Sequence, residues 1–146
     1  MKKSPEETAR IKAARVELGR LIYALHTAPS DKVMSSRKVA KAVGLEPPNF
    51  KGIEDGVNGP SPEIYEAIVS FLAPDDDYRK LMDQQYSIIR GTPPPDVCKI
   101  LCANEGLNNA LRVIDNQTLT KEQIAEVTAL LTSFKIHTTE GAATNG

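Results

Sequence analysis

Aromatic side chains are scarce in this 146-residue sequence: they make up 5% of it, and there is no tryptophan. A hydrophobic core must therefore consist mainly of leucine, isoleucine, valine and alanine, and cores of this kind are commonly built from helices. No stretch shows a trustworthy alternation of apolar and polar residues, which is the mark of a half-buried strand. The composition and the patterning together predict an all-α fold.

Long apolar runs are missing as well. No run approaches the roughly 18 residues that a membrane-spanning helix needs. The charged residues 1–7 lead into no apolar block like that of a signal peptide. We therefore expect a cytoplasmic protein that has no membrane partner.

Residues suited to metal binding or catalysis are few. Cys98 and Cys102 are too few for a disulfide scaffold, and they form no Cys-X-X-Cys pair. With His26 and His137 as the only histidines, we expect no metal site and no cofactor, and we interpret both cysteines as buried apolar residues. The acidic run 75–77 is typical of a helix N-terminus. Nothing suggests a nucleophile beside a base or a phosphate-binding glycine loop, so we predict that the protein is not an enzyme.

The charges are unevenly distributed, although the net charge is only -1. Residues 1–56 contain 11 Lys and Arg against 7 Asp and Glu, which gives +4. Residues 57–146 contain 7 Lys and Arg against 12 Asp and Glu, which gives -5. A basic N-terminal part joined to an acidic C-terminal part is compatible with nucleic-acid contact at one end.

Capping and turn signals predict five helices in residues 1–90. Ser4 and Glu7 form a capping-box pattern at the start of the first helix, and Gly44 is a stop signal for the second. The expected helices cover about 5–27, 35–43 and 47–55, with a fourth from residue 62 and a fifth from about residue 75. The fourth is expected to bury Ile64, Ile68, Phe71 and Leu72, and the fifth contributes Leu81, Met82, Ile88 and Ile89.

The second part of the chain follows a stiff, proline-rich stretch at 91–95, where we place a domain boundary. Residues 91–136 are expected to form two short helices and one long helix, which begins with a capping box at Thr120 and Gln123. The long helix has one apolar stripe, which is either part of an intramolecular core or a seam between copies: Ile124, Val127, Leu130, Leu131 and Phe134. Residues 137–146 are expected to be a disordered tail.

The stretch 35–56 has the features of a helix-turn-helix. Ala40 provides the small residue where two helices cross, and Gly44, four residues later, tolerates the positive φ that the turn needs. Apolar residues at the expected spacing fix the second helix on the first: Val39, Leu45, Phe50 and Ile53.

This stretch resembles the helix-turn-helix of the XRE family, which includes phage repressors and Cro proteins. The register holds from Ser35 to the ending Ile53-Glu54-Asp55-Gly56, and residues 59–64 resemble the family's entry to its fourth helix. The resemblance covers about residues 15–90. It implies a five-helix, repressor-like domain that binds operator DNA as a dimer, with its third helix in the major groove.

The resemblance also nominates the residues that would contact DNA. Ser35 and Ser36 occupy positions that contact the DNA backbone in the family, and Arg37 and Lys38 could reach phosphates. The base-reading positions fall on Pro47, Pro48 and Gly52, with Asn49 and Lys51 beside them.

Proline and glycine depart from the family pattern, because neither side chain can form hydrogen bonds with base edges. One interpretation is that the proline rings contact thymine methyl groups, that Asn49 reads adenine and that Gly52 allows a close approach. The other is that direct readout has been lost. We favour the first, because four basic residues remain on the expected DNA side: Arg37, Lys38, Lys41 and Lys51.

Two functional hypotheses follow. The first is a sequence-specific transcriptional repressor, without a self-cleavage domain, that binds operator DNA as a dimer or tetramer and is released by an antirepressor-type protein. The second is a protein-interaction module, such as an antitoxin-like or adaptor protein, that uses the same helical scaffold to bind a partner protein.

Overall fold

The structure, a computed structural model, describes residues 2–28, 33–114 and 119–144, with side chains given through Phe134. All regular secondary structure in these ranges is helical, which confirms the predicted all-α class. The chain divides into two compact units, residues 1–100 and 101–146. The first unit therefore extends beyond the proline-rich stretch 91–95, at which the sequence suggests a boundary.

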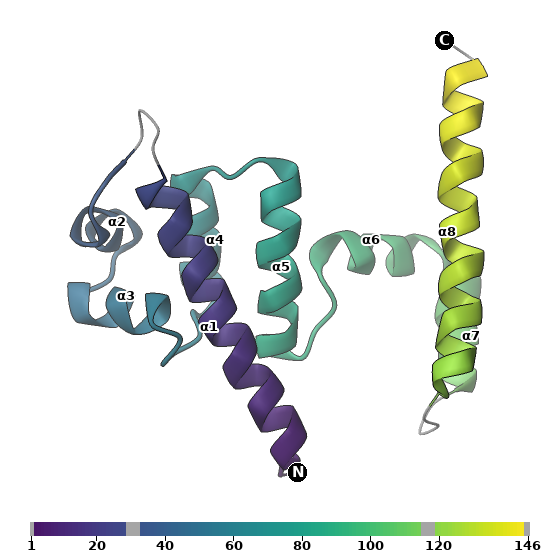
Figure 1. The fold of residues 1–146 in the computed structure, drawn as a ribbon, viewed down its shortest axis with the longest axis horizontal. Coiled ribbons are helices and arrows are strands. Elements are labelled where there is room, and N and C mark those ends of the chain that lie inside the picture. Colours follow the sequence, from purple (N-terminus) through teal and green to yellow (C-terminus); the bar gives the residue numbers. More distant parts are fainter. Residues whose placement is uncertain (1, 29–32, 115–118, 145–146) are drawn as a thin grey trace. The chain divides into compact units, whose positions relative to one another are not determined.

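Figure 1 shows the helices in chain order. The first unit contains α1 (Pro5–Thr27), α2 (Ser36–Val43), α3 (Pro47–Glu54), α4 (Pro62–Leu72), α5 (Asp76–Arg90) and most of α6 (Pro95–Ala103). The second unit contains the end of α6, α7 (Glu105–Val113) and α8 (Lys121–Thr144).

The predicted helix starts are confirmed by their capping hydrogen bonds. The Ser4 hydroxyl accepts from the Glu7 N–H, and the Glu7 carboxylate accepts from the Ser4 N–H, both at 3.1 Å. Thr120 and Gln123 exchange the same pair of bonds, at 3.1 and 2.9 Å, at the start of α8. Such reciprocal bonds satisfy backbone donors that a helix leaves unpaired at its start.

The turn between α2 and α3 has the geometry that its glycine predicts. Gly44 has φ of 81°, in the left-handed region, and its N–H points back to the carbonyls of Ala40 and Lys41. Val39, Ala40 and Phe50 are fully buried beside the turn. The two short helices are therefore packed on each other through the small and apolar residues expected at their crossing.

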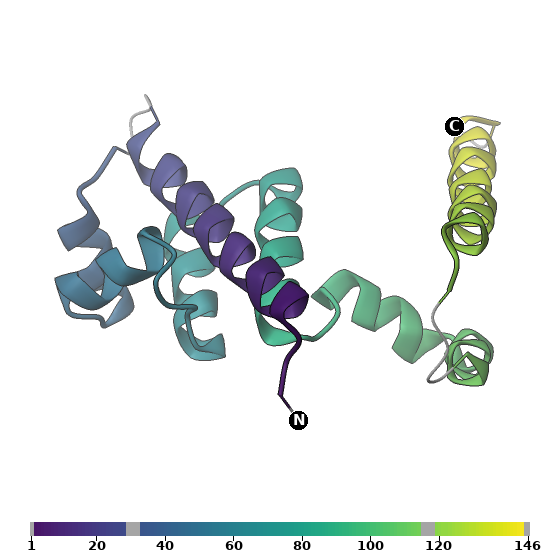
Figure 2. The ribbon, with the colours of Figure 1, turned by 60° about the horizontal axis from the view of Figure 1, so that its bottom comes forward.

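The first unit is centred on α1, which lies between α3 and α5 in both Figure 1 and Figure 2. Helix α2 contacts both α3 and α4. Gly19 marks the closest approach of α1 to α3, because a Cβ built there would lie 2.2 Å from the Glu54 carbonyl oxygen. The side chains at the centre of the core are fully buried: Leu18, Ile22, Phe50, Ile68 and Met82.

The buried face of α4 differs from the predicted one by a rotation of about one residue. Phe71 is 40% exposed, whereas the buried residues are Tyr65, Ile68, Val69 and Leu72. In α5, Leu81 is 57% exposed, while Asp83 next to Met82 is buried. The predictions failed because a tyrosine and an aspartate can be buried when they satisfy each other's polar atoms.

Three buried or half-buried tyrosines connect the helices of the first unit. The Tyr65 hydroxyl donates to Asp83 Oδ1 at 2.6 Å, and its ring stacks on Tyr86 with centroids 3.9 Å apart. The Tyr78 hydroxyl donates to the Leu21 carbonyl oxygen at 2.5 Å. Burial raises the pKa of Tyr65, Tyr78 and Tyr86, because it disfavours the phenolate form.

The second part of the chain corrects two predictions. Cys98 is half-buried and Cys102 is exposed, so the interpretation of both as buried apolar residues is wrong. Helix α8 continues to Thr144, where the sequence suggests a disordered tail from residue 137. Extending an existing helix forms a new hydrogen bond for each residue fixed, so few strong helix formers are needed there. Residues 145 and 146 lie outside the described ranges.

No residue of 101–114 or 119–134 is buried. The stripe on α8 is accordingly exposed, with more than half of each of its five apolar side chains accessible: Ile124, Val127, Leu130, Leu131 and Phe134. Among the described helices, none combines the length and the apolar character needed to cross a bilayer.

Candidate nucleic-acid interface

The nine residues nominated by the sequence lie on α2, on α3 and at the N-cap of α2. Ser36 and Gly52 are half-buried, and the other seven are exposed: Ser35, Arg37, Lys38, Pro47, Pro48, Asn49 and Lys51. Because α2 and α3 are consecutive and packed on each other, the exposed residues of both belong to one helix pair.

The first turn of α2 combines a cap with two cations. The Ser35 hydroxyl accepts from the Lys38 N–H at 3.2 Å, which leaves its own proton available for donation. Within the described part of the chain, neither Arg37 nor Lys38 forms an ion pair. This turn can therefore offer one hydroxyl and two unneutralised cations to an anionic partner.

The first turn of α3 has a different character, because it has no free backbone donor. Pro47 and Pro48 have no N–H, and the N–H groups of Asn49 and Phe50 both donate to the Glu46 carbonyl oxygen, at 3.0 and 3.2 Å. Helix starts usually bind anions through free N–H groups. Here the exposed surface consists of two proline rings and the side-chain amide of Asn49, which suits apolar groups and base edges better than phosphate.

Gly52 has a role inside the fold that the sequence did not indicate. Its carbonyl oxygen accepts from the N–H groups of Val57 and Asn58, at 2.9 and 3.2 Å. A Cβ at this position would lie 2.9 Å from the Asn58 side-chain nitrogen. The Asn58 amide is the end of a flexible side chain and can turn away, so the fold tolerates a side chain here and does not by itself require glycine.

Lys51 lies one turn before the end of α3 and pairs with Asp55, with Nζ 3.2 Å from a carboxylate oxygen. Both side chains are more than half exposed, so the pair contributes little to stability. The lysine can exchange Asp55 for another anion at small cost.

A buried histidine holds α3 against α1. His26, near the end of α1, is 1% exposed, and its two ring nitrogens lie 2.8 Å from the Met34 carbonyl oxygen and 3.0 Å from Glu54 Oε2. The Glu54 side chain is only 5% exposed. One ring thus connects the end of α1, the segment just before α2 and the last turn of α3.

The carbonyl partner of His26 fixes a proton on one of the two ring nitrogens. The Met34 carbonyl oxygen can only accept, so Nδ1 carries a proton. Nε2 faces the Glu54 carboxyl group, with which it forms the second hydrogen bond of the ring. The ring also contacts Tyr23 and Phe50, with centroids 5.6 and 6.2 Å away. The position of the nominated surface therefore depends on a polar group that is completely enclosed.

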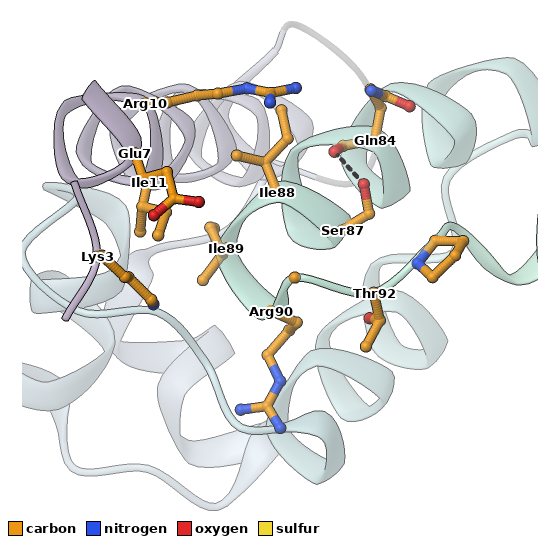
Figure 3. A pocket seen from close by; sticks show the side chains of 12 residues that line it. Lys3, Glu7, Arg10, Ile11, Gln84, Ser87, Ile88, Ile89, Arg90 and Thr92 are labelled. Atoms are coloured by element: carbon orange, nitrogen blue, oxygen red, sulfur yellow. Dashed lines mark hydrogen bonds between the residues drawn. The ribbon is translucent and has the colours of Figure 1, made fainter. Parts of the chain in front are cut away.

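Several clefts lie beside α1. One, of about 460 Å³, lies between the N-terminal half of α1 and the end of α5 (Figure 3). Ile11, Ile88 and Ile89 form its apolar part, and Lys3 and Arg10 lie along its edge. Within the described residues, no group of three or more His, Cys, Asp or Glu side chains is arranged to hold a metal ion.

Comparison with known proteins assigns no relative to the chain, since no family model, no curated protein and no solved structure matches it.

Proposed function

We propose that the first unit is a repressor-like DNA-binding domain formed by α1 to α5, and that the protein is a sequence-specific transcriptional repressor. Helix α3 would lie in the major groove of operator DNA, and the start of α2 would contact the phosphate backbone. The observation that supports this most is the pairing of two short helices around a left-handed glycine, with their nominated polar and basic residues exposed together.

The chemistry of the two helix starts suits two different kinds of DNA contact, phosphate contacts at α2 and base contacts at α3. Arg37, Lys38 and the Ser35 hydroxyl at α2 suit phosphate oxygens, which determine affinity but carry no sequence information. Pro47, Pro48 and Asn49 at α3 suit a thymine methyl group and an adenine edge. Lys51, which leaves Asp55 at small cost, could add a further contact.

The test is a selection of bound sequences from random duplex DNA. The wild-type chain should enrich a defined site, and the Asn49→Ala, Lys51→Ala variant should lose the enrichment. The matched control removes one amide and one lysine from exposed positions of α5, in a Gln84→Ala, Lys80→Ala variant, and should enrich the wild-type site. If the wild-type chain enriches no site, the readout by α3 is wrong.

We further propose that the C-terminal segment joins two or more copies through α8. Its apolar residues recur at 124, 127, 131 and 134, which is the alternating three-and-four spacing of a helix seam. The stripe is exposed within a single chain, and a second copy of α8 would cover it with a surface of the same kind. A dimer would present two α3 helices about 34–36 Å apart, to match a palindromic operator.

Solution mass tests this assembly in the full chain. A Val127→Lys, Leu131→Lys variant should be monomeric, whereas wild type should be a dimer or tetramer. The control, Ala125→Lys with Ala129→Lys, adds the same charge to α8 outside the stripe and should keep the wild-type mass. Equal masses for all three proteins would show that α8 has no role in assembly.

A second candidate function is a protein-interaction module, such as an antitoxin-like or adaptor protein. The proline-led start of α3 favours it, because a surface without free backbone donors can also pack against an apolar protein surface. The two functions differ in DNA affinity. The repressor should bind duplex DNA with an affinity that falls steeply with salt, whereas the interaction module should bind DNA weakly or only together with its partner.

A further inference from the structure

A second cleft of about 460 Å³ lies between α1 and the end of α3. Its walls come from the N-terminal half of α1 and from the loop that begins at Asp55, and no residue nominated from the sequence lines it. The lining residues are Lys3, Thr8, Ile11, Lys12, Arg15, Val16, Asp55, Gly56 and Val57.

Arg15 has a buried donor without a partner. Its Nε is shielded from solvent and forms no hydrogen bond. A Cβ built on Gly59 would lie 3.8 Å from this nitrogen, so the loop after α3 passes close to it. Buried polar atoms in proteins nearly always have partners, because leaving one unpaired is unfavourable. The Nε of Arg15 therefore has no acceptor among the described residues.

The cleft also has an excess of positive charge. Three of its lining residues are cations, Lys3, Lys12 and Arg15, and none of them forms an ion pair within the described ranges. Its only carboxylate, Asp55, is held by Lys51 at 3.2 Å. These cations suit an anion that accepts several hydrogen bonds, such as a phosphate.

The cleft lies at the C-terminal end of α3, opposite the end that begins with the two prolines. An eight-residue helix is about 12 Å long, and the major groove of B-DNA is about 12 Å wide. A helix that begins over the bases therefore ends near the edge of the groove, which phosphates line. The cleft continues from that end.

We propose that this cleft binds a backbone phosphate of the operator through Lys12 and Arg15, which gives the domain a backbone contact separate from the one at α2. This inference rests on the proposed DNA-binding function. It assigns to the first helix, and not only to the helix pair, a direct part in the affinity for DNA.

The test measures operator affinity against salt concentration for the full chain and for a Lys12→Ala, Arg15→Met variant. Methionine keeps an unbranched stem of similar length, so the packing at position 15 is preserved. Each phosphate contact contributes about 0.9 to the slope of log affinity against log salt. Because the two side chains share one phosphate, the variant should show a slope shallower by about 0.9 and should lose about 3.5-fold less affinity between 50 and 200 mM salt.

Two controls separate this role from general charge and from stability. A Lys80→Ala, Lys99→Ala variant removes the same charge from exposed positions outside the cleft and should keep the wild-type slope. The single Arg15→Met variant should melt at the wild-type temperature or above it in the absence of DNA, since it removes an unpartnered buried donor. A lower melting temperature would show that Arg15 has an internal structural role and would contradict the proposal.

Operator binding by the wild-type chain and the salt slope of the double variant together distinguish failure of this inference from failure of the proposed function. Operator binding by the wild-type chain with an unchanged slope in the double variant would overturn this inference alone. Failure of the wild-type chain to bind any duplex would overturn both. Saturable binding of inorganic pyrophosphate that Arg15→Met abolishes, with the DNA slope unchanged, would assign the cleft to a free phosphate compound and would also overturn the proposal.

Discussion

Replacing His26 by alanine should strongly destabilise the first unit. The substitution removes a fully buried ring and leaves the Glu54 carboxyl group enclosed without its partner, at a site where that group is 5% exposed. Breaking a buried ionic or hydrogen-bonded pair from one side costs about 3–5 kcal/mol. Because domains of this size are stable by only about 5–15 kcal/mol, the loss is a large fraction of the total.

A Glu54→Gln variant tests the reasoning without removing the ring. A glutamine amide can donate to an unprotonated Nε2 while Nδ1–H continues to donate to the Met34 carbonyl oxygen. Both hydrogen bonds can thus be kept with no charge at the site. We therefore expect Glu54→Gln to cost no more than about 1.5 kcal/mol, the range of a single neutral hydrogen bond.

The assay is urea denaturation of the full-length variants, followed by circular dichroism, with a double-mutant cycle between His26 and Glu54. The two single substitutions should be strongly non-additive, because they share one contact. The reasoning would be refuted if His26→Ala lowered the free energy of unfolding by less than about 1 kcal/mol, below the range for an unpaired buried group.

Three further predictions concern the turn, the closest helix contact and the tyrosines. Gly44→Ala should destabilise the protein by about 1–2 kcal/mol in urea denaturation, because φ is 81° and nothing lies within 4 Å to add a clash. A smaller loss would show that the turn can relax. Gly19→Ala should be worse than Gly44→Ala and should reduce operator binding, because its Cβ would lie 2.2 Å from the Glu54 carbonyl oxygen. An equal or smaller loss would mean that α1 and α3 separate easily. The third prediction concerns alkaline stability, because burial raises the pKa of three residues: Tyr65, Tyr78 and Tyr86. The stability from these groups is fully present below their unfolded pKa of about 10 and is lost as pH rises above it. In a Tyr23→Phe variant, which removes the one other tyrosine, an exposed residue, phenolate absorbance should therefore appear together with unfolding, and complete ionisation in a folded protein would contradict the burial.

Local features of the structure could be predicted because their causes are local. The caps at Ser4 and Thr120 depend on hydrogen bonds between residues three apart, and the positive φ at Gly44 depends on one side chain being absent. The buried positions Val39, Phe50 and Ile53 followed from the spacing of two short helices. The position of the nominated residues on two consecutive, packed helices could therefore be predicted from the sequence.

Long-range polar contacts could not be predicted in the same way. His26 and Glu54 are 28 residues apart, and nothing in the spacing of either residue marks the other as its partner. Tyr65 and Asp83 are 18 apart, and their hydrogen bond turned the buried face of α4 away from Phe71. The basic residues of α1 were visible as charges, but only the fold shows that Arg15 has a shielded nitrogen beside the loop after α3.

None of the residues 101–114 and 119–134 is buried. The behaviour of this segment should therefore depend on the protein concentration. Helices that bury no side chain fully receive little tertiary stabilisation. For this segment, folding and association would then be one equilibrium, governed by mass action. Its helix content should rise with protein concentration, and the occupancy of a two-site operator should rise more steeply than in simple proportion to concentration. Under the proposed function, dilution of the protein would then lower operator occupancy more than in simple proportion.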